Sequence, residues 1–211
     1  MSVITGLKTG KRREKRVNVF LDDSFAFSLE AEVVAKAALR VGQELTPRQE
    51  EELSGADRYQ RCLNAASRFL SYRPRSESEV RQRLLKHGYD AVSIDKAINR
   101  LKELELVDDT EFARFWAENR EQFSPRSRRL MKLELQRKGL ERDIIEQVIT
   151  GVNEDESAYR AAGKKVRSLP LSDYQVFRQR LAAYLGRRGF SYDVVKRTIE
   201  IIWKENSNVP T

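Results

Sequence analysis

The pattern of hydrophobic and polar positions changes its period along this chain, and the first segment alternates. Apolar residues take alternate positions in two short runs, Val17, Val19 and Leu21 and then Phe25, Phe27 and Leu29. Polar residues 22–24 separate the runs, and alternation on both sides of a polar break is typical of a two-stranded hairpin. Because an isolated hairpin is only marginally stable in water, we expect it to pack on a helix indicated at residues 30–39. The sequence therefore predicts a small N-terminal β-hairpin plus helix over residues 1–56.

From residue 57 onward the apolar positions recur with the spacing of amphipathic helices. The pattern predicts helices in three groups of three, at residues 57–72, 76–87 and 92–104, at 109–121, 125–138 and 143–151, and at 154–167, 172–188 and 192–204. The predicted fold is mainly α, with three tandem three-helix repeats at 57–107, 108–153 and 154–205 that form an elongated body. Residues 206–211 are expected to be a disordered tail. Ser124 is the expected N-cap of the helix at 125–138, with Pro125 at its first position.

An internal repeat with a period of about fifty residues supports the three groups. Each copy has a leucine, then two basic or imidazole side chains, then a glycine: Leu84, Lys86, His87 and Gly88; Leu135, Arg137, Lys138 and Gly139; Leu185, Arg187, Arg188 and Gly189. Each glycine falls where a helix end favours positive φ, and the cations before it complement the negative end of the helix dipole. Taken alone, the triplet is therefore better explained as helix-ending chemistry than as a binding motif.

A second short motif shows which copies are most alike. Pro74, Arg75 and Ser76 recur as Pro125, Arg126 and Ser127 at the same offset from the repeat glycine, whereas the third copy has Gln175, Val176 and Phe177. Copies one and two are therefore the closer pair. Tyr72 stands just before the first of these motifs, where an aromatic ring beside arginines could stack on bases. We favour instead a core position for Tyr72, packed with Phe69.

Basic charge is concentrated on the middle helix of each repeat. The chain has a formal net charge of +8 and a pI of about 9.6, so its field attracts polyanions, and nucleic acid is the first partner to consider. The cations that we expect to contact a filament or DNA are Arg73, Arg75, Arg81, Arg83, Lys86, Arg126, Arg128, Arg129, Lys132, Arg137, Lys138, Arg178, Arg187 and Arg188. The alternative is that they only solvate the outer helix faces. We favour the binding role because the same helices carry few acids.

Residue types that carry catalysis are scarce. The single histidine, His87, and the single cysteine, Cys62, argue against zinc sites and common acid–base or nucleophilic sites, and Cys62 is expected to be a core thiol. Gly163, with the lysines after it, lacks the rest of a phosphate-binding loop. Asp108 and Asp109 are expected at a helix N-cap, in preference to a nuclease metal site. We expect a non-enzymatic protein with no cofactor and no metal. No apolar run reaches the ~18 residues of a membrane span, so a cytoplasmic location and no membrane partner are expected.

The residues around the first repeat resemble the bacterial RecX regulatory proteins. The likeness is carried by Phe69, Leu70, Ser71, Tyr72, Arg73, Pro74, Arg75, Ser76, Glu77, Glu79, Val80, Leu84, Gly88, Leu104, Val107, Asp108, Asp109, Phe112, Ala113, Glu134, Leu135, Lys138 and Gly139. It extends over nearly the whole chain and is weakest in the first fifty residues and in the third copy. The cations Arg187 and Arg188 lie outside the motif and receive no role from it.

The resemblance implies three tandem three-helix modules and a modulator, usually an inhibitor, of the RecA recombinase. Such a protein lies in the groove of the RecA filament on single-stranded DNA, where it lowers ATP hydrolysis and blocks filament extension or strand exchange. Homologous recombination, DNA repair and the SOS response are the processes that follow from this role. We expect the chain to be a monomer that meets single-stranded DNA directly or through the filament.

Two other classes of protein stay open from the residues alone. A stand-alone helical nucleic-acid-binding protein, such as a transcription or RNA-binding factor, would use the same basic helices as recognition elements. A steep salt dependence on naked duplex together with a sequence preference would favour it. A nuclease is less favoured, and it would require magnesium-dependent cleavage that disappears in Asp108→Ala.

Overall fold

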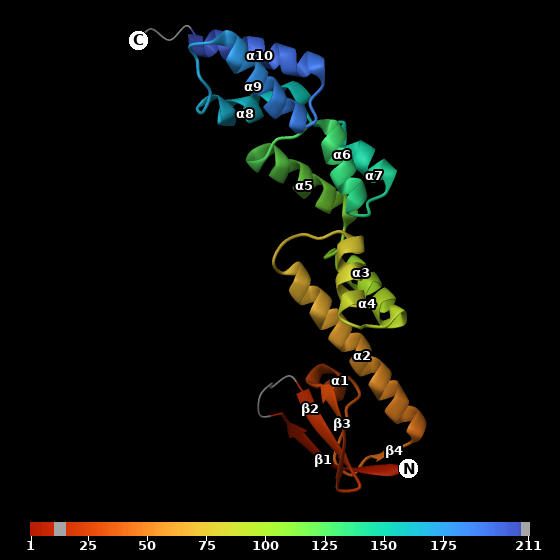
Figure 1. The fold of residues 1–211 in the computed structure, drawn as a ribbon. Helices are drawn as coiled ribbons and strands as arrows, with labels where there is room; N and C mark the ends of the chain where they lie inside the picture. Colours follow the sequence, from red (N-terminus) through yellow and green to blue (C-terminus); the bar gives the residue numbers. More distant parts are fainter. Residues whose placement is uncertain (11–15, 208–211) are drawn as a thin grey trace. The chain divides into compact units, whose positions relative to one another are not determined.

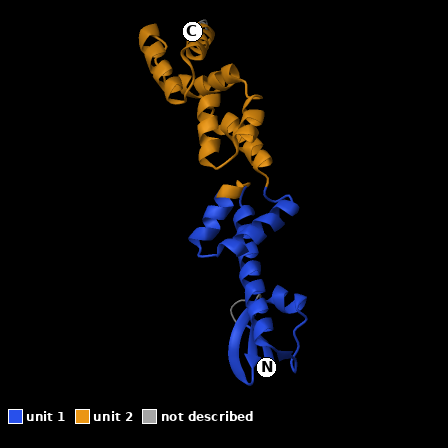
Figure 2. Cartoon of the chain, turned by 90° about the vertical axis from the view of Figure 1, so that its right-hand side faces the viewer, with its two compact units in different colours: residues 1–73, 79–107 blue, residues 74–78, 108–211 orange. Residues whose placement is uncertain are grey.

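The computed structural model describes residues 1–10 and 16–207 and forms two compact units (Figure 2). The first unit contains residues 1–73 and 79–107, and the second contains residues 74–78 and 108–211. The prediction of a disordered tail at 206–211 is wrong for its first two residues, because the last helix extends to Ser207. Residues 208–211 lie outside the described part.

The first unit begins with a four-stranded antiparallel sheet (Figure 1). Its strands are β1 (Ser2–Thr9), β2 (Arg16–Leu21), β3 (Ser24–Glu30) and β4 (Glu44–Leu45), in the order β3-β2-β1-β4. The predicted hairpin is confirmed as β2 and β3, with Val19 opposite Phe27. Asp22 and Asp23 both have positive φ, as a tight hairpin turn between right-twisted strands requires. Strands β1 and β4 were not predicted.

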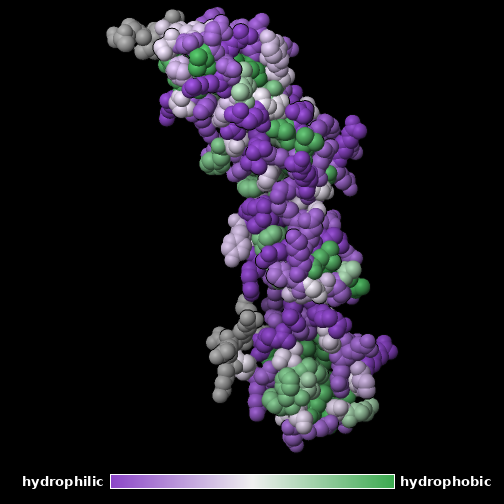
Figure 3. Space-filling model, in the orientation of Figure 1, coloured by the Kyte–Doolittle hydropathy of each residue, from purple (hydrophilic) through white to green (hydrophobic). Residues whose placement is uncertain are grey.

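One face of the sheet packs on helices α1 (Ala31–Lys36) and α2 (Pro47–Leu70). The shared core contains Ile4, Val19, Leu21, Leu29, Val33, Leu39, Leu45 and Leu53. The expected packing of the hairpin on a helix is therefore present, although α1 is shorter than the predicted 30–39. On the opposite face the rings of Phe20 and Phe25 meet edge to face at 6.0 Å. Figure 3 shows hydrophobic residues at the surface in this part of the chain, while hydrophilic residues cover most of the remaining drawn face.

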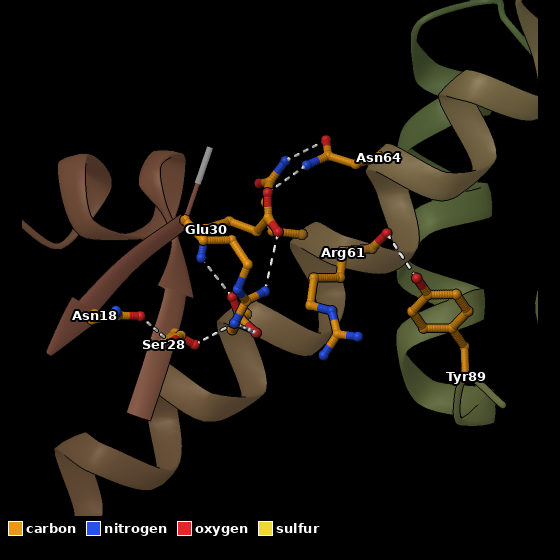
Figure 4. A network of polar contacts seen from close by, with 9 residues as sticks. Asn18, Ser28, Glu30, Arg61, Asn64 and Tyr89 are labelled. Carbon is orange, nitrogen blue, oxygen red and sulfur yellow. Dashed lines mark hydrogen bonds and ion pairs between the residues drawn. The ribbon is translucent and has the colours of Figure 1, made fainter. Parts of the chain in front are cut away.

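A polar network ties the sheet to α2 (Figure 4). The carboxylate of Asp57, which is buried, accepts a hydrogen bond from the backbone N–H of Glu30 at 2.7 Å and lies 3.5 Å from the guanidinium of Arg16. Glu30 in turn accepts from Arg16 at 3.1 Å and from the amide of Asn64 at 3.3 Å. Because a buried carboxylate is costly without such partners, this network fixes where α2 crosses the sheet.

Helix α2 also serves as the first helix of the first repeat. It packs with α3 (Glu77–Lys86) and α4 (Ala91–Glu103) around Cys62, Ala66, Val80, Leu84, Ile94, Ala97, Ile98 and Leu101. The predicted boundary between residues 56 and 57 is therefore wrong, since it falls inside one continuous helix. Gly55 did not end the helix because a single glycine in a helix interior costs only about 1 kcal/mol.

Two further three-helix bundles make up most of the second unit. The second repeat consists of α5 (Asp109–Phe123), α6 (Arg128–Arg137) and α7 (Arg142–Ile149), and the third consists of α8 (Glu154–Val166), α9 (Tyr174–Arg187) and α10 (Tyr192–Ser207). Each has its own core, centred on Phe112 and Met131 in one and on Phe177 and Leu181 in the other. The mainly α fold with three tandem three-helix repeats is confirmed.

Two local predictions are wrong. The N-cap of α6 is Ser127, whose hydroxyl accepts a hydrogen bond from the N–H of Leu130, and not Ser124. Tyr72 is 77% exposed and does not join the core. Tyr72 lies just after the end of α2. At that end of the helix, Phe69 and Leu70 are the residues that pack against the first repeat's core.

Candidate binding surface of the middle helices

Glycines end the three middle helices α3, α6 and α9, as the repeat motif predicts. Gly88, Gly139 and Gly189 have φ of +78°, +81° and +85°. After each glycine, the next N–H bonds back to the repeat leucine's carbonyl, as in the bond from Leu140 N–H to the Leu135 oxygen at 3.3 Å. This is the hydrogen-bonding pattern of a left-handed helix end, so the structural interpretation of these glycines is confirmed.

In the second unit the glycine end of one repeat rests on the start of the previous repeat's middle helix. The carbonyl of Lys138 accepts a hydrogen bond from the Ser76 hydroxyl at 2.7 Å, and the carbonyl of Arg188 accepts one from the Ser127 N–H at 3.0 Å. A Cβ on Gly139 would overlap Ser78, and one on Gly189 would lie 2.5 Å from the Ser127 Oγ. We call this contact the repeat joint. It couples the helix ends through a carbonyl and a buried serine.

The repeat joint explains why the copies differ. Ser76 and Ser127, the serines of the two Pro-Arg-Ser motifs, are fully buried where they receive the following repeat. The third copy has Phe177 where the others have that serine, and within the described residues no repeat rests on it. At the other end, Gly88 has no preceding repeat, and nothing lies within 4 Å of a Cβ placed there. Within the described residues, the Pro-Arg-Ser motif therefore occurs in the two copies on which a joint forms and is absent from the copy on which none forms.

In copies two and three, the side chain of the cation directly before the glycine packs against an aromatic ring of its own repeat. The Lys138 ammonium lies 4.9 Å from the centroid of the Trp116 ring, and the Arg188 guanidinium lies 4.5 Å from that of Tyr184. Arg188 also donates a hydrogen bond to the Ser124 hydroxyl at 3.3 Å. Both residues are among those expected to bind a partner, and in the folded chain their side chains have these intramolecular contacts.

Other expected binding residues also have intramolecular partners. Arg73 pairs with Glu79, Arg81 with Asp95, Arg126 with Glu134 and Lys132 with Glu146. Arg128 donates to the Val152 carbonyl, and Arg83 lies over the Phe69 ring. Arg75 is half-buried. The paired cations contribute less net field than the sequence suggested, because a carboxylate neutralises each of them locally.

Five of the expected residues keep the features of a binding surface, and we call them the outer cations: Lys86, Arg129, Arg137, Arg178 and Arg187. Each is exposed, and within residues 1–10 and 16–207 none has a carboxylate at ion-pair distance. Lys86, Arg137 and Arg187 stand two residues before the repeat glycine in their copies. The two residues of the repeat motif's basic pair therefore lie in different environments. In copies two and three the second member packs against an aromatic ring, while the first is exposed in all three.

The one acid of α6 is withdrawn from that surface. Glu134 is largely buried and accepts hydrogen bonds from the Trp116 indole at 2.8 Å and from Arg120 at 2.7 Å, besides its ion pair with Arg126. With its carboxylate enclosed by these donors, α6 presents its remaining cations to solvent without a competing acid. Neither the Trp116 contact nor the Arg120 contact was foreseen, since both join residues of α5 to α6 across a turn.

The residues considered for chemistry take structural positions. Asp108 caps α5, where its carboxylate accepts from the N–H groups of Thr110 and Glu111, and Asp109 accepts from the N–H of Glu77 at 2.8 Å. Cys62 is buried, and burial raises the pKa of its thiol to about 11, with a smaller contribution from Asp90. In the described residues no group of three metal-binding side chains occurs, and no helix is long and apolar enough to cross a membrane.

Comparisons with known proteins decide the family. Models of the RecX N-terminal domain and of the first, second and third RecX three-helix domains match residues 2–46, 62–101, 108–149 and 153–199. A Regulatory protein RecX of Clostridium botulinum strain Alaska E43 is 31% identical over 205 residues, with 95% of this chain and 96% of the relative covered. The chain belongs to the RecX family.

Other RecX proteins give the same result. The Bacillus velezensis Regulatory protein RecX is 32% identical over 211 residues, covering 99% of this chain and 80% of the relative. A crystal structure of a regulatory protein RecX aligns with a TM-score of 0.72 at 22% identity, over 95% of this chain and all of the other, and so shares the fold. RecX from Lactobacillus salivarius aligns with a TM-score of 0.59 at 26% identity, over 69% and 96%.

Proposed function

We propose that this protein binds the RecA filament on single-stranded DNA and inhibits its ATPase, filament extension and strand exchange, without catalysis of its own. Membership of the RecX regulatory family supports the choice of partner. The observation that carries the proposal is the outer cation two residues before each repeat glycine, which is exposed in all three copies.

A repeated cation suits a repeated acidic partner. A nucleoprotein filament offers phosphates and identical protein subunits at regular intervals, so each repeat of this chain can meet an equivalent surface. Once one repeat is bound, the others meet their contacts at a high effective concentration, and modest single contacts add up to tight binding. The residues of the repeat joint serve to connect the repeats, and we assign them no direct contact with the partner.

The test removes four outer cations of the second unit together. Replacing Arg129, Arg137, Arg178 and Arg187 by Gln lowers the formal charge from +8 to +4. Four exposed contacts of about 0.5 kcal/mol each give about 2 kcal/mol, a loss of roughly thirtyfold in affinity for RecA filaments on single-stranded DNA. Binding is measured by co-sedimentation at fixed moderate salt.

A matched control separates position from net charge. Replacing Arg40, Arg61, Arg68 and Lys96 by Gln also gives +4, at exposed positions outside the middle helices. We expect this variant to bind filaments within about twofold of the unaltered chain, since diffuse charge acts weakly at moderate salt. Equal losses in both variants would show that only net charge matters and would remove the outer cations from the interface.

A stand-alone nucleic-acid-binding protein is the second candidate, and the exposure of Tyr72 favours it. An exposed aromatic ring beside arginines can stack on an unpaired base. Under this alternative, binding to naked nucleic acid would be as tight as binding to the filament, and Tyr72→Ala would weaken both equally. A filament affinity well above the affinity for naked DNA would rule it out.

A further inference from the structure

A cationic cleft in the second unit lies outside the middle helices. It has a volume of about 590 Å³ and is lined by Glu121, Gln122, Arg160, Gly163, Lys164 and Arg167. The first two residues belong to the end of α5, and the others to α8 or the residue after it (Figure 1). The cleft therefore lies where the second repeat meets the third.

Three cations share one face of α8 in this cleft. Arg160, Lys164 and Arg167 are spaced four and three residues apart, which places them along one side of a helix, and all three are exposed. Arg160 pairs with Glu156, whereas Arg167 has no ion pair in the described part of the chain. The one acid that lines the cleft is Glu121. The cleft therefore favours an anion over a cation.

Lys164 fixes the position of this charge. Its ammonium donates to the carbonyl of Gln122 at 2.8 Å and to that of Phe123 at 3.1 Å, so it closes the C-terminal end of α5. A lysine has three N–H donors, and one remains for a ligand. The two hydrogen bonds thus hold the positive charge of this side chain at the wall of the cleft before any partner arrives.

Two further features indicate the kind of anion. Gly163 lies within the cationic face, and nothing lies within 4 Å of a Cβ placed there, so a ligand can approach the helix backbone closely. Phe123, whose carbonyl Lys164 holds, is 63% exposed. Phe123 directly follows a residue that lines the cleft, and a cationic cleft next to an exposed aromatic residue in the chain fits a phosphodiester with an unpaired base, because bases of any sequence stack on such rings. In duplex DNA the bases are stacked on one another and cannot reach the ring.

We propose that this cleft binds one phosphate of single-stranded nucleic acid while Phe123 stacks on the adjacent base. The site deepens the proposed function, on which it rests, by giving the chain a direct contact with the strand that the filament covers. It is separate from the outer cations, which lie on α3, α6 and α9.

The experiment measures binding of a fluorescent oligothymidylate to the full chain by anisotropy, without RecA. Gly163→Glu places an acid in open space on the cationic face, and Gly55→Glu makes the same change in α2, where only the Arg58 side chain lies within 4 Å. We expect Gly163→Glu to weaken binding about tenfold and to reduce the salt slope by about one, the effect of one lost phosphate contact. Gly55→Glu should stay within about twofold of the unaltered chain.

A second variant addresses the ring. Phe123→Ala should weaken oligothymidylate binding with an unchanged salt slope and leave duplex binding unaltered, because stacking involves no counterion release. Circular dichroism melting confirms that each variant is folded. Oligothymidylate binding unaltered in both Gly163→Glu and Phe123→Ala would overturn the proposal. Equal losses on duplex, or displacement of the oligonucleotide by equimolar inorganic pyrophosphate, would show a general anion site and would also overturn it.

The assay distinguishes failure of the cleft site from failure of the proposed function. The assay contains no RecA, so a chain that binds oligothymidylate through the cleft and leaves RecA unaffected would refute filament regulation alone. A chain that inhibits RecA equally well with and without Gly163→Glu, and whose oligothymidylate binding is also unaltered, would refute the cleft alone.

Discussion

The repeat joint makes a prediction that compares two glycines with the same sequence context. Gly189 and Gly88 both end a middle helix at positive φ, +85° and +78°. Only Gly189 lies in a joint, where a Cβ would be 2.5 Å from the Ser127 Oγ and 2.6 Å from the Leu130 Cγ, while Gly88 faces open space. Replacing each by alanine therefore separates the cost of backbone strain from the cost of steric overlap.

The two costs have different sizes. An alanine held in the left-handed region costs about 1–2 kcal/mol, and this applies to both positions. At Gly189 the added methyl also forces a shift in tight packing, about 1–3 kcal/mol, and weakens the bond from Ser127 N–H to the Arg188 carbonyl, about 0.5–1.5 kcal/mol. We expect Gly88→Ala to lower the free energy of unfolding by about 1–2 kcal/mol and Gly189→Ala by about 3–6 kcal/mol.

Urea denaturation followed by circular dichroism gives the total change, and amide hydrogen exchange gives its location. Because the chain has two units, each unfolding transition is fitted separately. Exchange at the Ser127 amide should accelerate strongly in Gly189→Ala and remain unaltered in Gly88→Ala, since that N–H donates in the joint. Equal destabilisation by the two variants, with Ser127 still protected, would refute the joint as a stabilising contact.

Two further predictions concern residues that were considered for chemistry. Burial raises the pKa of the Cys62 thiol from its ordinary value of 9.0 to about 11, so the folded state retains the proton between these values and stability falls as pH rises from 9 to 11. Cys62→Ala should therefore show a shallower decline of stability in urea titrations across that range. A pH slope identical to that of the unaltered chain would contradict this reasoning. Asp108→Ala should lower the melting temperature through loss of about 1 kcal/mol of N-cap stabilisation of α5, as followed by calorimetry, and an unchanged melting temperature would count against the capping role.

Local patterns were enough to predict the repeats because their signals lie within a few residues. Helical periodicity, helix-ending glycines and the alternation of β2 and β3 each depend on neighbours in sequence. Strand β1 was missed because its register shifts between Ile4 and Gly6, which interrupts the alternation. Strand β4 is two residues long and exists only by pairing with β1.

The candidate site was harder to predict because the sequence does not show which cations have intramolecular partners in the folded chain. The Ser76 hydroxyl meets the Lys138 carbonyl across 62 positions, so nothing local distinguishes a cation of the joint from an outer one. The one available signal was that the third copy lacks Pro-Arg-Ser, which indicates that the motif serves a following repeat. The predicted core position of Tyr72 was wrong for a related reason, since the residues near the end of α2 that meet the core are decided by tertiary packing.

If this chain regulates a RecA filament, it changes the rate of ATP hydrolysis by RecA on single-stranded DNA. The chain is titrated into a fixed amount of RecA at moderate salt, with the Gln variant of Arg129, Arg137, Arg178 and Arg187 in parallel. We predict that hydrolysis falls at well below one molecule per RecA and that the variant needs a much higher concentration for the same effect. Unchanged hydrolysis at equimolar protein, with naked-DNA binding intact, would contradict the account and favour the stand-alone nucleic-acid-binding protein.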